Sequence, residues 1–443
     1  MFHLISCVVI VAFFILVMKA RSNSGVALGL AWSTFALEQV LQQAFPILWT
    51  HGAIVNVSIA AVITYSVLGA WLRKNQSLEV PDVPLLAMYL LLALTFLSYF
   101  WSAAPASTLQ YLIKMAPYLL VFVVITPLCA NESSSVSTAV KVTVFFGGLV
   151  IFNLLFSNFG RRSVVLELAG GQQVEGNPLA IADYASTVAI CGVFILFGGQ
   201  VRKLHALVIS AVVVTSVYLV MRSHCRGQLI AVFASLLVWL PVTYRELRRR
   251  SFFLPSAAIC FLCLAAVFFM QQNSMANRWE SRFVTQAGQD RFVMVSSLLR
   301  QFQESDYWVW AVGLGNSSSF RLVGYYPHNV PVEVLCEEGL IGCLLLAAFV
   351  GGTLKMNIQL LRQRRIHRTA RFNTGLLLAL FTFHAILSLK QGSLIGSCFM
   401  LSFGACLTLA GRRYRASFDH PVMRDSKDSS RALVFQPISK RAA

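Results

Sequence analysis

The stretch Tyr325-Tyr326-Pro327-His328-Asn329-Val330-Pro331-Val332-Glu333 lies where a long polar loop gives way to an apolar helix. A histidine and an asparagine stand at this boundary, and Glu333 and Glu337 follow in the first turns of the helix. The apolar run continues to residue 354, which is long enough to cross a bilayer. We therefore expect the rest of the chain to be membrane structure that holds this loop in place.

The composition places the chain among membrane proteins. Of its 443 residues, 57% are hydrophobic and 12% are charged, whereas a soluble domain carries about 25% charged residues. Apolar runs of about 17 to 25 residues recur, each long enough for one transmembrane helix. The sequence lacks the short alternating segments of a membrane β-barrel. It predicts an all-α fold, a polytopic membrane helical bundle.

The apolar runs predict about 12–13 transmembrane helices. The count depends on residues 25–45, which carry a glutamate and three glutamines and form either a span or a re-entrant or amphipathic segment. The first run is expected to be a retained span, because its positive charges follow the apolar core, unlike those of a cleaved signal peptide. The expected spans are 2–18, 25–45, 54–72, 83–100, 113–130, 138–157, 181–200, 204–221, 228–244, 252–270, 329–354, 372–389 and 392–410.

The basic residues set the orientation of these spans. The net charge is +18, and most Lys and Arg lie in short segments between alternate spans. By the positive-inside rule these segments face the cytoplasm. No nucleic-acid partner is expected, because the charge follows the topology instead of forming one basic surface. The remaining loops are expected on the external side, near 46–53, 101–112, 158–180, 222–227, 271–328 and 390–391.

This topology divides the chain into four parts. They are an N-terminal transmembrane bundle (1–270), a large periplasmic loop (271–328), C-terminal transmembrane helices (329–410) and a cytoplasmic basic tail (411–443). Loops as long as the second part are usually functional. This loop is also expected to fold, because apolar residues recur in it at helical spacing, at Phe292, Val295, Leu298 and Leu299.

Cysteines and carboxylates give little indication of a metal site. Cys260-x-x-Cys263 has redox or metal spacing, but it falls inside an apolar span with no second pair nearby, so packing is the expected role. No acidic pair has the spacing of metal ligands. We expect no disulfide framework, no metal and no cofactor.

Several arginines lie on the external side, against the positive-inside bias. Arg226 stands in the turn Arg222-Ser223-His224-Cys225-Arg226-Gly227, and Arg291 stands in the long loop. Guanidinium groups bind phosphate bidentately and keep their charge, so a lipid-linked phosphate or pyrophosphate would suit them. The alternative is that individual arginines snorkel or form surface ion pairs. Arg226 is the stronger candidate, because Gly227 permits close backbone approach.

His328 is the candidate general base. Neutral imidazole near a reacting hydroxyl can take its proton, because the pKa of histidine lies near working pH. The alternative is a helix-cap or interface histidine. Asn329 is expected to cap the helix that follows. Glu333 and Glu337 lie on one helical face, where they either orient His328 or face water.

The run Gly313-Leu314-Gly315-Asn316-Ser317-Ser318-Ser319 resembles a phosphate loop only superficially. It lacks the following Lys-Ser/Thr and the preceding apolar strand of a P-loop. We expect a compact turn that holds the long loop near the membrane.

Taken in order, these motifs resemble a known family. A Cys-Arg-Gly turn, an Arg-Phe element, Gly-Leu-Gly-Asn and then Tyr-Pro-His-Asn-x-x-x-Glu-x-x-x-Glu-x-Gly-x-x-Gly resemble the O-antigen ligase and polymerase superfamily of bacterial envelope glycosyltransferases. Trp101-Ser102-Ala103-Ala104-Pro105 and Gly176-Asn177-Pro178-Leu179-Ala180 are also similar to that family. The resemblance covers about residues 85–410, with 311–342 its most specific segment. In one departure, Cys225 precedes Arg226 where the family usually has serine.

The resemblance implies a GT-C-like membrane enzyme that needs no metal. It would transfer a glycan from an undecaprenyl-pyrophosphate carrier to an acceptor hydroxyl at the periplasmic face of the bacterial inner (cytoplasmic) membrane. Arg226 and Arg291 would bind the pyrophosphate and His328 would activate the acceptor. Tyr326, Asn329, Glu333 and Glu337 would support them. The partners implied are the lipid-linked glycan, a glycan, lipid A core or protein acceptor, membrane lipids, and other envelope polysaccharide assembly proteins as candidates.

Alternatives remain open at this point. A polysaccharide (exopolysaccharide or O-antigen) polymerase is the first interpretation, on the look of Trp101–Pro105; a ligase and an O-linked protein glycosyltransferase are the others. A lipid-linked glycan flippase or transporter would place charges along a path inside the spans, and the spans here are nearly free of charge. A membrane scaffold without chemistry would tolerate loss of His328 or Arg226.

Overall fold

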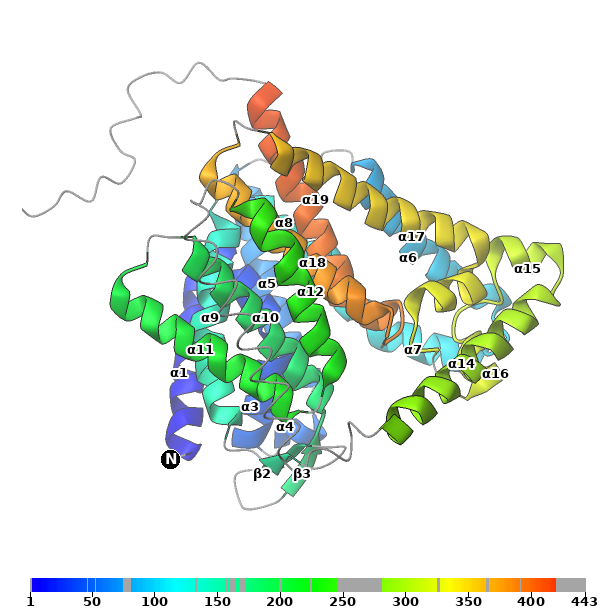
Figure 1. Ribbon diagram of the computed structural model, residues 1–443, viewed down its shortest axis with the longest axis horizontal. Helices are drawn as coiled ribbons and strands as arrows, with labels where there is room; N and C mark the ends of the chain where they lie inside the picture. Colours follow the sequence, from blue (N-terminus) through cyan, green and yellow to red (C-terminus); the bar gives the residue numbers. More distant parts are fainter. Residues whose placement is uncertain are drawn as a thin grey trace, which may run out of the picture.

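The computed structural model is an all-α membrane bundle with one small sheet (Figure 1). The structure describes residues 2–45, 47–51, 53–74, 81–131, 134–155, 158–159, 164–167, 173–198, 201–223, 225–244, 281–324, 327–363, 366–390 and 392–419. The predicted span 252–270, with Cys260 and Cys263, lies outside these residues.

Helices occupy the other predicted spans. Within the described ranges nine helices are long and apolar enough to cross a membrane, and the two apolar segments Cys7–Ala20 and Ile54–Gly69 are shorter. The long helices that match predicted spans directly are α6 (Val83–Leu97), α9 (Ser135–Leu154), α10 (Pro178–Phe197), α11 (Lys203–Arg222), α12 (Arg226–Thr243), α17 (Val330–Arg362), α18 (Arg368–Ser388) and α19 (Cys398–Asp419).

The N-terminal third begins with α1 (Phe2–Ala20) and then divides the expected span 25–45 into two helices. These are α2 (Ser24–Trp32) and α3 (Thr34–Ala44). The break falls at Ser33, whose hydroxyl donates to the Gly29 carbonyl at 2.9 Å. Such side-chain bonds compete with the helical ladder and bend helices. Two further helices follow, the short α4 (Ile47–Thr50) and the longer α5 (Ala53–Lys74).

The expected external loop 101–112 is mostly helix, which corrects the prediction. A 3₁₀ turn, η1 (Ser98–Trp101), leads through three residues into α7 (Pro105–Tyr118), the π-helical η2 (Leu119–Ile125) and α8 (Thr126–Leu128). Proline at the first helical position has no N–H to leave unpaired, so it starts α7 readily. The span is therefore Pro105–Leu128, and the connection is closed by η3 (Cys129–Asn131).

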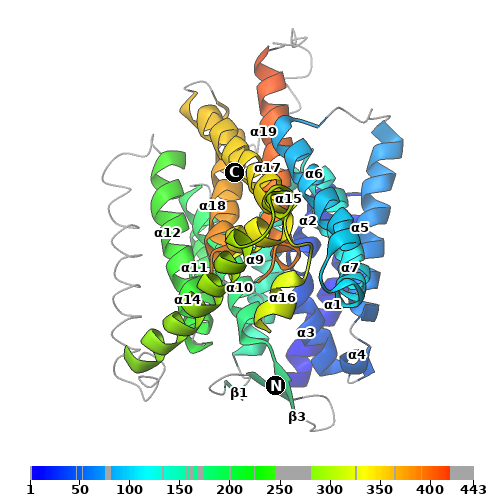
Figure 2. The same cartoon turned by 90° about the vertical axis from the view of Figure 1, so that its right-hand side faces the viewer.

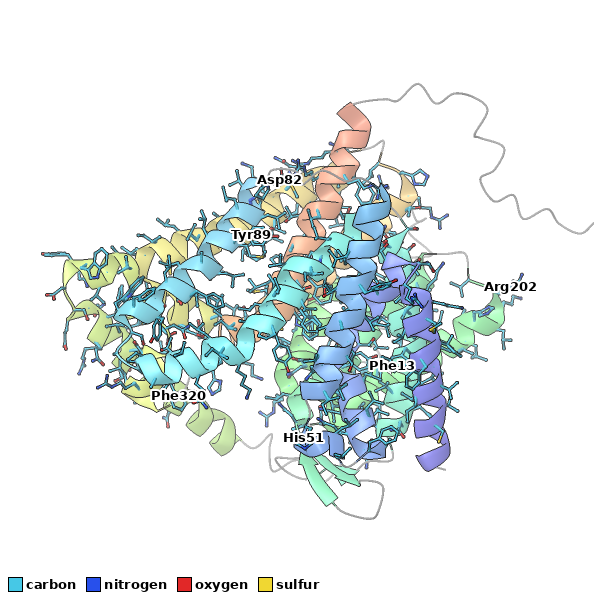
Figure 3. The ribbon with its side chains drawn as sticks, turned by 180° about the vertical axis from the view of Figure 1, so that it is seen from behind. Phe13, His51, Asp82, Tyr89, Arg202 and Phe320 are labelled. Carbon is cyan, nitrogen blue, oxygen red and sulfur yellow. The ribbon has the colours of Figure 1, made fainter. Side chains whose placement is uncertain are left out.

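The two ends of the bundle differ. At one end lies an antiparallel sheet of β1 (Asn158–Phe159), β2 (Val164–Glu167) and β3 (Gln173–Gly176), within the predicted external segment 158–180. We call this the hairpin end, and the opposite end, where α19 finishes, the tail end (Figure 1). At the tail end Arg412 pairs with Asp82 at 3.9 Å. Figure 3 labels Asp82 there, with His51 and Phe320 toward the hairpin end.

The long loop is folded, as predicted. It contains α14 (Ser281–Gln303), α15 (Tyr307–Val312) and α16 (Ser318–Val323), which lie beside α17 on one side of the bundle (Figures 1 and 2). Leu298 and Phe302 of α14 are buried against Cys336 of α17. The expectation for Phe292 is wrong, because its side chain is 74% exposed. Among the described side chains of α14, the buried ones therefore lie in its C-terminal half.

Candidate functional site

A kink in α17 organises the site. Gly339 has φ 70° and ψ −164°, a conformation open essentially only to glycine, and it interrupts the helix. The kink leaves the carbonyls of Cys336 and Glu337 without their helical partners. The N–H groups of Leu314 and Gly315 donate to them at 2.8 and 2.9 Å. The turn after α15 therefore replaces the hydrogen bonds that the kink removes.

Glycine makes this close approach possible. Gly313 has φ 80°, and a β-carbon there would lie 2.2 Å from the Glu337 carbonyl. A β-carbon on Gly339 would lie 2.4 Å from the Ala311 carbonyl oxygen. Two backbones meet here with no room for side chains. The compact turn predicted for Gly313–Ser319 is confirmed, and its role is to lock α17 in the kinked form.

The Glu337 carboxylate binds the later residues of the same turn, Ser317 and Ser319. It is 1% exposed and accepts hydrogen bonds from the backbone N–H groups of Ser317, at 2.9 Å, and Ser319, at 3.1 Å. The Ser319 hydroxyl also donates to it. The prediction that Glu337 could face water is wrong, because these donors hold its side chain inside the protein.

The segment around Trp101–Pro105 supports the turn from the other side. The hydroxyls of Ser102 and Thr108 each donate to the Asn316 carbonyl at 2.7 Å, and the Asn316 N–H donates to the Ser98 hydroxyl at 2.9 Å. The Arg321 guanidinium donates to the Ala103 carbonyl. Two motifs about two hundred residues apart therefore form one rigid unit.

His328 lies immediately before α17 in a strained conformation. Its φ is 53°, one of two positive values among the non-glycine residues described, and its side chain is half-buried. Histidine tolerates this left-handed region better than most residues, and such outliers cluster at functional sites. The neighbouring helix cap holds it there.

Asn329 forms the predicted cap. Its Oδ1 accepts from the Val332 N–H at 3.1 Å. Its Nδ2 donates to the Leu389 carbonyl at 3.3 Å, in the connection between α18 and α19. One side chain thus fixes the start of α17 and ties it to a second loop.

Glu333 makes a second contact with the connection between α18 and α19. Its side chain is 2% exposed, and its two carboxylate oxygens lie 3.3 and 3.2 Å from the Leu394 N–H, which donates to them. The water-facing alternative is therefore wrong for Glu333 as well. Glu333 and Glu337 bind different segments, so each holds a separate stretch of backbone against α17.

Arg226 is the first residue of α12, with a half-buried side chain. The thiol of Cys225 donates to the Ser223 carbonyl at 3.3 Å and weakly to the Pro178 carbonyl at 3.7 Å. Cysteine thus keeps the turn hydrogen-bonded.

Lys390 lies directly over this turn. A β-carbon on Gly227 would stand 2.4 Å from the Lys390 Nζ, so the ammonium group rests against the Gly227 backbone. The N–H of Lys390 donates to the Leu387 carbonyl at 2.9 Å, which fixes the residue at the end of α18. Lys390 therefore lies against the residue that follows Arg226, although the two positions are far apart in sequence.

Lys390 and Asp183 were not among the predicted site residues. Lys390 carries the charge of a very short loop predicted to be external, and Asp183 is an acid inside a predicted span; both features are unusual. The Gln228 side chain donates to the Asp183 carboxylate at 3.1 Å. These two signals were available in the sequence, but only the fold brings them beside Arg226.

A continuous path links the two principal predicted residues. It runs from His328 to its neighbour Asn329, across the hydrogen bond to Leu389, along the chain to Lys390, and onto Gly227 beside Arg226. Arg291 lies on α14, and its side chain falls outside the described part, as does Tyr326 entirely. Within the described ranges no three His, Cys, Asp or Glu side chains group as metal ligands would.

The comparison with protein families agrees with the motifs. Residues 211–347 match the family described as O-antigen ligase. The matched segment runs from α11 into α17 and includes Arg226, His328, Glu333 and Glu337. The resemblance predicted from the motifs is confirmed by this match, which supports a glycosyltransferase-like envelope enzyme with several membrane-spanning helices. No curated protein matches the chain.

Proposed function

We propose that this protein transfers a glycan from an undecaprenyl-pyrophosphate carrier to an acceptor hydroxyl at the periplasmic face of the bacterial inner membrane, as a polysaccharide polymerase. The observation that carries the proposal is the contact path from His328 through Asn329, Leu389 and Lys390 to Gly227. This path supports a site in which one set of contacts holds the candidate base His328 near the candidate cations Lys390 and Arg226.

The cations would bind the leaving group. Arg226 offers a planar fork of donors that suits phosphate, and Lys390 adds a compact charge beside it. Arg291 would complete the set from α14. Pyrophosphate departs readily once its charge is neutralised, so fixed cations in a water-poor site lower the barrier to glycosyl transfer.

The base would act on the acceptor. Neutral His328 takes the proton of the acceptor hydroxyl while its oxygen forms a bond to the anomeric carbon of the donor glycan. The bond from that carbon to the pyrophosphate oxygen breaks, and its electron pair leaves with undecaprenyl pyrophosphate. The histidine then returns its proton to solvent. The strained backbone at His328 and the cap at Asn329 would hold the imidazole in register with the donor.

The remaining predicted residues would position these groups. Glu333 fixes the loop that carries Lys390, and Glu337 fixes the turn that locks the kink of α17. Neither carboxylate needs to touch substrate for this role. Tyr326 precedes His328 by two positions and would contribute to the same boundary.

A ligase is the second candidate, favoured by the match to a family described as O-antigen ligase. The acceptor would then be a lipid A core, or a protein in the O-linked variant. Deleting the protein and analysing surface glycans separates these cases. We expect the loss of long chains, with single repeats still reaching the surface. Long lipid-linked chains that accumulate without attachment would identify a ligase. Unaltered glycans would reject both, and repeats trapped on the cytoplasmic side would indicate a flippase.

Two substitutions test the site itself. We expect His328→Ala and Arg226→Ala to keep normal protein levels and abolish glycan transfer. Arg300→Ala is the matched control, because Arg300 belongs to the same long loop and its side chain is exposed on α14; transfer should persist in it. Near wild-type glycan from either site variant would remove that residue from the mechanism.

A further inference from the structure

A cavity of about 350 Å³ lies between α2, α10, α18 and the start of α19. Its wall runs from Asn177 and Leu179 at the start of α10 to Trp32 at the end of α2. An aromatic floor is formed by Trp32, His384, Phe399 and Phe403: the imidazole stacks on Phe399 and Phe403 at 5.5 and 5.2 Å, and the indole lies 5.1 Å from Phe403.

Two buried nitrogen atoms of this floor lack hydrogen-bond partners. Trp32 Nε1 and His384 Nε2 find none among the described residues, although the side chains are only 2% and 7% exposed. A buried polar group without a partner destabilises the protein, more so where no water can reach it. These atoms therefore indicate an occupant that carries hydrogen-bonding groups. An isoprenoid tail would leave both unsatisfied.

The wall adds a carboxylate at a fixed position. Asp183 lines the cavity while Gln228 holds one of its oxygens at 3.1 Å. Aromatic faces, a carboxylate and scattered donors and acceptors together suit a ring with an apolar C–H face and a rim of hydroxyl groups. The volume lies at the small end of ligand sites, about 300–1,000 Å³, which accommodates one or two sugar rings.

The cavity adjoins the two backbone segments that carry Arg226 and Lys390. Ser388 and Gly392, which line it, flank Lys390 in sequence, and the Gln228 that holds Asp183 follows Arg226 by two positions. A pyrophosphate bound by Arg226 and Lys390 would therefore carry its first sugar at the mouth of the cavity.

We propose that this cavity binds the sugar nearest the pyrophosphate of the lipid-linked donor, with Trp32, Asp183 and His384 as the recognition residues. The proposal rests on the proposed function, since it assigns a part of the same donor. In this role the cavity would select donors by their first sugar before transfer takes place.

The test measures binding of two lipids to the full-length protein in nanodiscs. One probe is the lipid-linked glycan extracted from the producing cells, and the other is sugar-free undecaprenyl pyrophosphate. Trp32→Phe and His384→Phe keep the aromatic stack and remove the nitrogen atoms. We expect each to weaken binding of the glycan lipid about fivefold, the loss of one hydrogen bond, and to leave binding of the sugar-free lipid unchanged.

Trp239→Phe is the matched control. It makes the same change in a Trp that is 6% exposed, donates to Thr382 at 2.8 Å and lies outside the cavity. It should bind both lipids as the wild type does. His384→Phe provides an independent reading if Trp32→Phe fails to fold.

Three outcomes would overturn the inference. Equal losses for both lipids would assign the cavity to the pyrophosphate or the tail. No loss for either lipid would show that only water fills it. A wild-type protein that binds neither lipid would overturn the proposed function together with this inference, whereas the first two results leave the proposed function intact.

Discussion

The Asn329 side chain donates a hydrogen bond to the Leu389 carbonyl across 3.3 Å, while its other end caps α17. This contact ties the residue after His328 to the residue before Lys390. The candidate base and one candidate cation are therefore held by a single amide. The amide oxygen caps α17 and the amide nitrogen binds Leu389, so a substitution can remove one hydrogen bond and keep the other.

Asn329→Asp keeps the cap and removes the amide donor. We expect the melting temperature in detergent to stay near wild type, because Asp caps helices as well as Asn does. Transfer should fall about tenfold, a loss of about 1.4 kcal/mol, because the connection to Leu389 is broken. Asn23→Asp is the control, since Asn23 caps α2 through the same kind of bond to the Gly25 N–H at 2.9 Å. Equal transfer in both variants would contradict a linking role for Asn329.

Lys390 and Gly227 can be tested as a pair. Lys390→Ala should reduce transfer strongly, and Lys390→Arg should restore part of it by returning the charge. Gly227→Ala should mimic the loss in part, because a β-carbon would displace the ammonium group, whose flexible chain can move away. The double variant should be no worse than Lys390→Ala alone, which is the signature of two residues acting through one contact.

Lys114→Ala is the charge control for that experiment. Lys114 lies on α7 with an exposed side chain, so transfer should persist without it. Additive losses from Gly227→Ala and Lys390→Ala would show that the glycine acts by another route.

Adding a single β-carbon at Gly339 tests the kink of α17. Gly339→Ala should lower stability by about 1–3 kcal/mol, the cost of a disallowed backbone conformation, with the steric conflict against Ala311 added to it. Thermal unfolding in detergent measures the change. Gly351→Ala, in the same helix, is the control, because nothing lies within 4 Å of the added carbon. It should be neutral or slightly stabilising. A neutral Gly339→Ala would mean that the kink is not held by the α15 turn.

Glu337→Gln should loosen the turn before α16. The amide offers one acceptor where the carboxylate offers two, so a backbone N–H of Ser317 or Ser319 loses its partner, at about 1–3 kcal/mol. Hydrogen–deuterium exchange at residues 317–319 should accelerate, and transfer should fall. Glu304→Gln, an exposed position at the end of α14, should change neither. Unchanged exchange in Glu337→Gln would show that Ser317 and Ser319 are held by other groups.

The spans were predictable because bilayer crossing imposes a length and a composition that can be counted. The predicted helix boundaries and buried faces were wrong where the local sequence matters more than the length and composition of an apolar run. Residues 101–112 look polar enough for a loop, yet Pro105 starts a helix there. Phe292 has helical spacing, but α14 turns that residue outward. The polar residues of 25–45 left a span or a re-entrant segment open, and the position of the break, at Ser33, is marked by a side-chain hydrogen bond to the Gly29 carbonyl.

The stretch from Tyr325 to Glu333 was predicted as a polar boundary that begins a helix, and Asn329 as its cap. Those features depend on residues next to one another, so sequence alone determined them, together with the class of fold and the resemblance to a family. The direction in which Glu333 and Glu337 point was not determined, because both burial and exposure fit their spacing. Only the tertiary structure decided it, since Leu394, Ser317 and Ser319 arrive from distant segments to bind them. The same holds for Lys390 over Gly227: contact between two loops far apart in sequence depends on how the helices pack.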